Sequence, residues 1–404
     1  MLTKNSSPRW DIFCTVVDNF GDIGVCWRLA RQLAKEHKLT VRLWVDDLIA
    51  FQQLCPAVTL QAQQQQQHVE IRHWQASTDF SSITAADAVI EGFACTIPPQ
   101  YLAAMAARPI APIWFNLEYL TAETWAGEYH GLPSIEPNSG LYKYFFLPGF
   151  EAKTGGLLRE ASLLAQRDSL QQDLAARSEF LTSLGLDPAA DALLISLFSY
   201  ENTALPELLD AMSTGEQTLH LVIPQGRVTT VVETYLGEAL IPGRPIVRGA
   251  LCLQAVTFMT QINYDRLLWC CDLNIVRGED SLVRAIWSGR PLLWHCYPQQ
   301  NDEHLIKVKA LLNLYLPSIP PALSQIVATL WLGWNQSDNE NKKASKKQID
   351  KIHSELNNNS VGTIWSAYIT NINTLSTHAK AWSSILTKQP DLATQLLLFY
   401  KKLL

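Results

Sequence analysis

The 404-residue sequence lacks the features that mark several large classes of protein. It contains no run of about 18 apolar residues, so we expect no membrane-spanning helix, and its short polar start, residues 1–8, has no apolar core of a signal peptide. It also lacks a basic excess, because the formal net charge is −6, whereas nucleic-acid-binding proteins normally carry a surplus of Lys and Arg. We therefore expect a cytoplasmic protein that binds neither membranes nor nucleic acids.

Two chemical motifs are also missing. None of the eight cysteines forms a C-x-x-C pair, and most lie in apolar runs, so we expect buried free thiols rather than disulfides or zinc ligands. No G-x-x-x-x-G-K-[S/T] loop occurs, which argues against a P-loop nucleotidase. The pair Asp46-Asp47 has no neighbours that complete an oxygen shell, so we predict no metal site.

Strand-like apolar runs alternate with helix-like segments in two successive series. The first series begins with a strand over Trp10–Val17 and a helix over Val25–Lys35, and the pattern restarts after residues 185–188 with a strand over Ala192–Phe198. Two such series predict an α/β fold with two Rossmann-like domains, residues 1–184 and residues 185–385. The last segment, residues 386–404, reads as an amphipathic helix, which we expect to pack back on the N-terminal domain.

The pattern or composition of three further segments predicts their local structure. Leu157–Leu184 is helical in pattern. The run Gln61–Gln67 is of low complexity and predicts a solvated loop tip, and Gln336–Asn359, rich in Asn, Lys and Ser, predicts a solvated helix or loop.

One candidate site is the turn Asp18-Asn19-Phe20-Gly21-Asp22-Ile23-Gly24, which follows the first predicted strand. Open α/β sheets bind their ligands at such turns, so Asp18 and Asp22 are candidate catalytic carboxylates. A structural explanation is equally open, in which Asp22 caps the next helix and Asp18 closes an Asx-turn. Glu91 ends the predicted strand Ala88–Glu91, and Glu118 follows the predicted strand Ile113–Phe115. Both are candidates for the same wall of a cleft, with capping or a solvated loop charge as the alternative.

A second candidate site lies in Val276-Arg277-Gly278-Glu279-Asp280-Ser281. A strand is expected to run into Arg277, and a helix is expected to start at Asp280 or Ser281. An arginine beside the free N–H groups of a helix start suits a diphosphate. The alternative is that Asp280 caps the helix while Arg277 pairs with Glu279 on the surface.

Aromatic and amide side chains accompany this second site. Phe198 and Tyr200 follow one predicted strand, and Phe258 and Gln261 lie between two other predicted elements. Such side chains suit a planar base, although aromatic residues at these positions more often belong to a core. His295, after another strand, is interpreted as a structural histidine rather than an acid or base.

Together these stretches resemble the elongation factor P arginine rhamnosyltransferases. The resemblance covers most of the chain up to about Leu314, in the expected order and spacing. It rests on the segments Asp18 to Val25, Phe198 to Glu201 and Arg277 to Ser281, and it extends through Asn116 to Leu120, Thr154 to Glu160 and Gly289 to His295.

The resemblance implies an inverting glycosyltransferase of the GT-B type, with two Rossmann-like domains facing a central cleft. It implies transfer of L-rhamnose from TDP-β-L-rhamnose to one arginine of elongation factor P, with no cofactor and no metal. Asp18 and Asp22 would face the acceptor, and Glu279 would bind a nucleotide hydroxyl or act on the sugar. The donor would be held by Phe198, Tyr200, Phe258, Gln261, Arg277, Glu279, Asp280 and Ser281.

Two rival functions stay open on the sequence. One is a GT-B enzyme that uses another nucleotide sugar or another acceptor. The other is a non-catalytic module that senses a nucleotide and binds the translation factor. The runs Gln61–Gln67 and Gln336–Asn359 depart from the family pattern.

Overall fold

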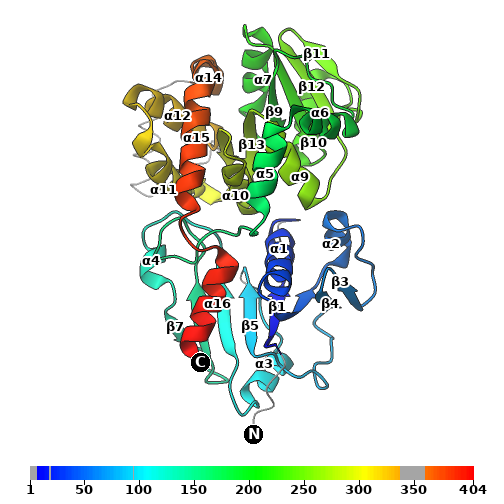
Figure 1. Cartoon of the computed structure of the whole chain (residues 1–404), viewed down its shortest axis with the longest axis vertical. Coiled ribbons are helices and arrows are strands. Elements are labelled where there is room, and N and C mark those ends of the chain that lie inside the picture. Colours follow the sequence, from blue (N-terminus) through cyan, green and yellow to red (C-terminus); the bar gives the residue numbers. More distant parts are fainter. Residues whose placement is uncertain (1–6, 18–19, 94, 337–359) are drawn as a thin grey trace. The chain divides into compact units, whose positions relative to one another are not determined.

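The computed structural model describes residues 7–17, 20–93, 95–336 and 360–404. The chain forms two compact units: unit 1 comprises Met1–Ala161 and Thr387–Leu404, and unit 2 comprises Ser162–Leu386. Each is a twisted, mainly parallel sheet covered by helices (Figure 1). Within the described ranges no helix is long and apolar enough to cross a membrane.

Unit 1 contains an eight-stranded sheet in the order β3-β4-β2-β1-β5-β6-β8-β7. The inner strands pair in parallel, and only the edge strands β3 and β7 are antiparallel to their neighbours. Buried apolar runs form the central strands because both faces of a parallel sheet are covered. The strands are β1 (Arg9–Cys14), β2 (Thr40–Val45), β3 (Gln63–Gln66), β4 (Val69–His73), β5 (Ala88–Gly92), β6 (Ile113–Leu117), β7 (Pro133–Ile135) and β8 (Tyr142–Phe146).

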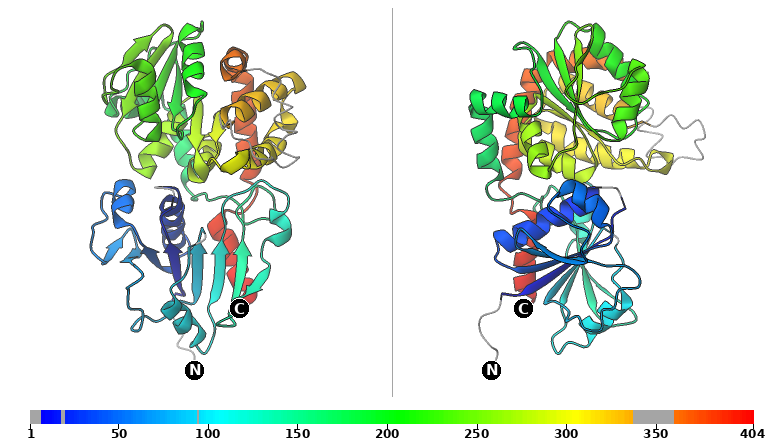
Figure 2. Two further views of the ribbon diagram at one scale, coloured as in Figure 1. Left: turned by 180° about the vertical axis from the view of Figure 1, so that it is seen from behind. Right: turned by 90° about the vertical axis from the view of Figure 1, so that its right-hand side faces the viewer.

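Helices cover both faces of this sheet. Successive side chains of a strand point to opposite faces, so residues of β1 contact helices on both sides. Trp10 packs against Tyr400 of α16, with ring centroids 5.1 Å apart, whereas Phe13 packs against Tyr101 of α3 at 4.8 Å. The side view in Figure 2 shows α16 (red) and α3 (cyan) on opposite sides of the sheet. The helices of unit 1 are α1 (Gly21–Lys35), α2 (Leu48–Leu54), α3 (Pro99–Ala106), α4 (Ala126–Tyr129) and α16 (Leu392–Leu403).

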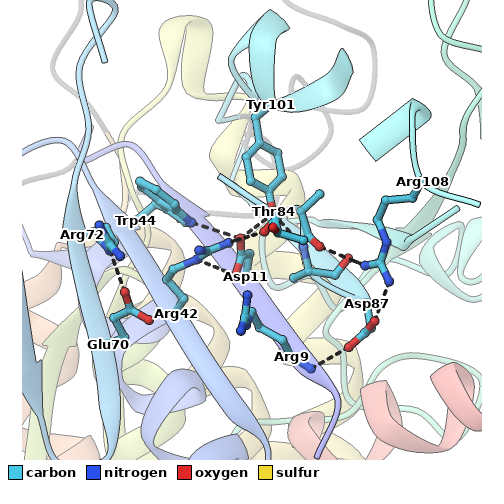
Figure 3. A network of polar contacts seen from close by, with 12 residues as sticks. Arg9, Asp11, Arg42, Trp44, Glu70, Arg72, Thr84, Asp87, Tyr101 and Arg108 are labelled. Atoms are coloured by element: carbon cyan, nitrogen blue, oxygen red, sulfur yellow. Dashed lines mark hydrogen bonds and ion pairs between the residues drawn. The ribbon is translucent and has the colours of Figure 1, made fainter. Parts of the chain in front are cut away.

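A buried polar network lies on the α3 face of the sheet (Figure 3). Asp11 is fully buried and accepts hydrogen bonds from Arg42 Nε at 3.0 Å, from Trp44 Nε1 at 3.2 Å and from the Tyr101 hydroxyl. Arg42 stands opposite Asp11 in the β1–β2 register, so strand pairing brings the two charges together. The network ties β1 and β2 to α3.

The prediction of a solvated loop over Gln61–Gln67 was wrong for its central part. Gln63–Gln66 forms β3, which pairs antiparallel with β4 and turns back through Gln67 and His68, both with positive φ (47° and 69°). Consecutive positive φ values are typical of a two-residue hairpin turn. Backbone pairing with β4 therefore overrides the polar composition.

Unit 2 contains a six-stranded sheet in the order β11-β12-β10-β9-β13-β14, parallel except for the edge strand β11. Its strands are β9 (Leu193–Leu197), β10 (Leu219–Pro224), β11 (Ile246–Arg248), β12 (Leu251–Val256), β13 (Leu273–Arg277) and β14 (Leu292–His295). Its α-helices are α5 (Leu163–Gln172), α6 (Leu174–Ser183), α7 (Leu205–Thr214), α8 (Arg227–Leu236), α9 (Gln261–Cys270), α10 (Gly278–Ser288), α11 (His304–Tyr315), α12 (Pro321–Trp334), α14 (Val361–Thr370) and α15 (Ile372–Leu386); the 3-10 turns are η1 (Gln300–Asp302) and η2 (Leu316–Ser318).

The division of the chain differs from the expected one. Residues 162–184, assigned from the sequence to the first domain, belong to unit 2 as α5 and α6. Their polar side chains satisfy the last carbonyl groups of α9 and α10, which lack partners within those helices. Arg167 Nη1 donates to Trp287 O at 2.8 Å, Gln171 Nε2 to Ser288 O at 2.9 Å, and Arg177 Nη2 to Cys270 O at 2.8 Å.

The C-terminal segment returns to unit 1, where α16 lies beside α1 (Figure 1). Asp391 caps α16 through the Thr394 N–H, and Gln32 of α1 donates to Asp391 Oδ1 at 3.0 Å. No elements were predicted for residues 321–335 and 360–386, which contain α12, α14 and α15. The Gln336–Asn359 prediction lies almost wholly outside the described residues, which include only Gln336 of it.

Candidate functional site

Each sheet has one point where the strand order reverses. In unit 1, β1 lies between β2 and β5, and in unit 2, β9 lies between β10 and β13. At such a point the loops after the two central strands diverge to opposite faces, which leaves a crevice at the carboxyl ends. Asp22 lies in the first turn of α1, the helix after β1. Phe198 and Tyr200 follow β9, and Arg277 ends β13. Both candidate sites therefore lie at these points.

In unit 2 the structure brings Arg277, Phe198 and Tyr200 together. The Arg277 guanidinium carbon lies 4.7 Å from the centre of the Phe198 ring and 4.6 Å from that of Tyr200. Because β9 and β13 are paired, the Phe198 N–H also donates to Ile275 O at 2.9 Å, which fixes the two strand ends to each other. Two aromatic rings therefore hold a buried cation at the carboxyl ends of the central strands β9 and β13.

The helix after Arg277 starts earlier than expected. It begins at Gly278, with Arg277 in the N-cap position, so the prediction of a start at Asp280 or Ser281 was wrong, and Asp280 is not the cap that the structural alternative required. Gly278 adopts a φ of +61°, which permits the tight turn from strand to helix. Glu279, Asp280 and Ser281 occupy the first turn, where the positive end of the helix dipole lies.

Trp294 fixes this turn from the neighbouring strand. Its indole N–H donates to Gly278 O at 2.7 Å, and the side chain of Asn335 in turn donates to Trp294 O at 2.7 Å. In a trans peptide the carbonyl and the next N–H point in opposite directions, so this hydrogen bond also sets the direction of the Glu279 N–H. The role of Trp294 cannot be seen in the sequence, because it arises only from the β13–β14 register.

The two residues expected to contact a base lie just before and at the start of α9. Gln261 is its first residue and is buried, and Thr260 caps the helix by accepting the Asn263 N–H. Phe258 is half-buried in the preceding loop. Arg284 of α10 forms a buried ion pair with Asp265 of α9 at 2.8 Å, which fixes the two helices relative to each other.

His295 has the properties of a structural residue. Burial is the main cause that lowers its pKa to about 3, with smaller contributions from His304 and Arg277. Its ring packs edge-on against Tyr200, at 5.4 Å, and against Trp334. It is therefore neutral at physiological pH and supports the Tyr200 ring.

In unit 1 the loop after β1 is held by two carboxylates. Asp22 is buried in the first turn of α1 and accepts the Val17 N–H at 3.0 Å, while Asp46 accepts the Val16 N–H at 2.9 Å. The helix begins at Gly21 with Phe20 as N-cap, so Asp22 is not the cap residue. Asp18 lies outside the described residues.

Two further carboxylates follow strands of unit 1. Glu91, at the end of β5, accepts a hydrogen bond from Lys143 Nζ at 3.1 Å, and burial raises the pKa of its carboxyl group despite this cation. Glu118 accepts from Asn116 Nδ2 at 2.5 Å. Neither carboxylate caps a helix in the structure.

All eight cysteines are free, and seven are buried, which confirms the prediction of free thiols. Three of them, Cys14, Cys26 and Cys95, lie close together in unit 1. Burial raises the pKa of the Cys95 thiol to about 12, and Thr15 Oγ1 donates to its sulfur at 3.3 Å. The pKa of the Cys14 thiol is also raised, by a hydrogen bond with Cys26 and by burial, so Cys14 and Cys95 are protonated packing groups at neutral pH.

Comparison with known proteins gives one consistent family. The family model for "Elongation-Factor P (EF-P) rhamnosyltransferase EarP" matches residues 10–401. A protein-arginine rhamnosyltransferase of Pseudomonas putida is 49% identical over 394 residues, which cover 97% of this chain and 98% of the relative. The Pseudomonas aeruginosa protein of the same name is 46% identical with the same coverage, and that of Shewanella oneidensis is 40% identical over the full length of both chains.

Solved structures agree with this result. One, described as the structural basis for EarP-mediated arginine glycosylation of translation elongation factor EF-P, is 36% identical, has a TM-score of 0.68, and is matched over 98% of this chain and 100% of its own. Acinetobacter baumannii MurG, at 11% identity and a TM-score of 0.50, shares the fold, with 98% of this chain and 100% of MurG covered. The predicted α/β fold of the GT-B type, with two Rossmann-like units, is confirmed.

Proposed function

Because this chain belongs to the elongation factor P rhamnosyltransferase family and is a protein-arginine rhamnosyltransferase, we propose that it transfers L-rhamnose from TDP-β-L-rhamnose to an arginine of elongation factor P, with inversion at the anomeric carbon. Unit 2 binds the donor and unit 1 binds the acceptor arginine. The reaction takes place in the cytoplasm, without a cofactor or a metal.

The observation that carries the donor assignment is the Arg277 guanidinium held over Phe198 and Tyr200 at the start of α10. A diphosphate gains both a fixed cation and the N–H groups of a helix start at this place. Gln261 and Phe258, with the Phe198 ring, contact the thymine base. Glu279, Asp280 and Ser281 bind the ribose and the diphosphate from the first turn.

The acceptor presents a chemical difficulty that carboxylates solve. An arginine side chain has a pKa above about 12 and is protonated, so its nitrogen is a poor nucleophile. Asp22 and Asp18 bind and orient the cation, and Asp22 accepts the proton as the nitrogen attacks. The nitrogen forms a bond to the anomeric carbon while the bond from that carbon to the phosphate oxygen breaks, and the electron pair stays on TDP. A single displacement of this kind inverts the anomeric centre.

Intact-mass analysis tests the overall reaction. Purified elongation factor P is incubated with the protein and TDP-β-L-rhamnose, and we expect the mass of one deoxyhexose to be added to an arginine. Parallel reactions with UDP- and GDP-sugars test the choice of donor. Complex formation without any mass change would support the non-catalytic alternative, and transfer from a UDP- or GDP-sugar would contradict the choice of TDP-rhamnose.

Two substitutions separate binding from chemistry. Asp22→Asn keeps an oxygen that accepts the Val17 N–H but removes the base, so transfer should be lost while TDP still binds. Asp46→Asn is the matched control, because Asp46 also holds this loop, and it should stay active. Arg277→Ala should weaken TDP binding about 10- to 100-fold, as expected for hydrogen bonds to a charged group. Calorimetry that shows unchanged affinity would refute the diphosphate assignment.

A further inference from the structure

Arg227 occupies an electrostatically unfavourable position that neither the sequence motifs nor the proposed donor contacts explain. It is the first residue of α8, the helix that follows β10, and comes directly after the N-cap residue Gly226. Cations near a helix N-terminus face the positive end of the helix dipole. Its side chain is exposed, and within the described residues no carboxylate forms an ion pair with it. A cation kept in such a place without a counter-charge suggests an anionic ligand.

The position of the guanidinium indicates which ligand this is. The Arg227 guanidinium carbon lies 6.0 Å from the centre of the Tyr200 ring, the same ring over which Arg277 lies at 4.6 Å. The turn before it also contacts the donor-site aromatics, since a Cβ on Gly226 would stand 3.2 Å from Phe198 Cε2. Two arginines, one in the segment after β10 and one at the end of β13, therefore lie near the same ring, that of Tyr200.

The two arginines differ in burial. Arg277 is buried and held by two rings, whereas Arg227 is exposed and lies 6.0 Å from the centre of the Tyr200 ring. A diphosphate carries more than one negative charge, and additional charge develops on its terminal phosphate as the sugar leaves. One buried arginine suits the phosphate nearest the nucleoside, and an exposed one suits the phosphate that bears the sugar.

We propose that Arg227 is a second diphosphate-binding residue, which contacts the sugar-bearing phosphate of the donor. This assignment rests on the proposed donor site. As the bond between the anomeric carbon and the phosphate oxygen breaks, the electron pair moves to that oxygen, and the Arg227 guanidinium stabilises the charge by hydrogen bonding without giving up a proton.

Calorimetry with three ligands tests the proposal. For Arg227→Gln we expect TDP affinity to fall about 10-fold, TMP affinity to fall less than about 2-fold, and thymidine affinity to stay unchanged, because only TDP has the second phosphate. Arg227→Lys, which keeps the charge, should recover part of the loss. The unfolding midpoint of ligand-free Arg227→Gln should stay equal to that of the wild type or rise, since a cation is removed from a helix start.

Matched controls separate this proposal from the donor-site assignment. Arg266→Gln removes an arginine that lies 4.1 Å from the Phe180 ring, outside the candidate site, and should leave all three affinities unchanged. Unchanged TDP affinity in Arg227→Gln, or an equal fall for TDP and TMP, would overturn the role of Arg227. Failure of the wild type to bind TDP would instead overturn the donor site itself.

Discussion

The Asp11–Arg42 pair allows a quantitative prediction, because the same region contains a matched exposed pair (Figure 3). Asp11 is fully buried, the Arg42 side chain is 5% exposed, and Arg42 Nη2 lies 2.5 Å from Asp11 Oδ2. Asp11→Asn removes the charge and turns amide N–H groups toward a buried guanidinium that has only donors. Removing one partner of a buried ion pair costs about 3–5 kcal/mol, so we expect a free-energy loss of that size.

Asp87→Asn is the control. Asp87 is paired with Arg108 at 2.7 Å, but the two side chains are 39% and 25% exposed, so the loss should be only about 0–1 kcal/mol. Hydrogen exchange measured on peptides from β1 and β2 reports the local opening free energy in unit 1 without assuming that the two units unfold together. Equal losses in the two variants would refute the reasoning that burial decides the cost.

Three other predictions concern the donor site, the buried His295 and the contact of the C-terminal segment with unit 1. Trp294→Phe removes the hydrogen bond to Gly278, and TDP affinity measured by calorimetry should fall about 3- to 10-fold while thymidine affinity stays unchanged; an unchanged TDP affinity would count against the role of the indole. His295 has a folded pKa of about 3, below the usual unfolded value of about 6.5, so the unfolded state binds more protons between these values and stability falls as the pH drops. Urea unfolding should show a loss of about 2 kcal/mol from pH 7.5 to pH 5, smaller in His295→Phe, and equal slopes would contradict this assignment. Gly156→Ala places a Cβ 2.6 Å from Pro390 O at a φ of +73°, and should cost about 1–3 kcal/mol and increase proteolysis between α15 and α16; wild-type resistance would contradict it.

Much of the architecture could be predicted from local sequence. Mainly apolar runs such as that of β9 indicate strands covered on both faces, and Asp391 before an amphipathic segment indicates the start of α16. The helix dipole and the strand-to-helix turn at Arg277 also follow from local chemistry. The residues that sequence reasoning identified on unit 2 share one edge of the sheet because parallel strands all end on the same side.

Other features depend on contacts between distant segments. The glutamine run becomes β3 only because β4 offers an open edge, and α5 and α6 join unit 2 only because Arg167, Gln171 and Arg177 reach the ends of α9 and α10. No local pattern marks such partners. The start of α10 at Gly278 is likewise fixed from β14, by the hydrogen bond from Trp294.

The sequence by itself determined two α/β units and the chemical types available at their strand ends, because hydrophobic periodicity and turn residues act locally. Only the tertiary structure decided which of these side chains meet. Phe198 and Tyr200, expected as base contacts, hold the Arg277 guanidinium, and Arg227 at the start of α8 lies near the same Tyr200 ring. The physical reason is that a cation over an aromatic ring depends on strand order and register, which bring together residues far apart in the chain.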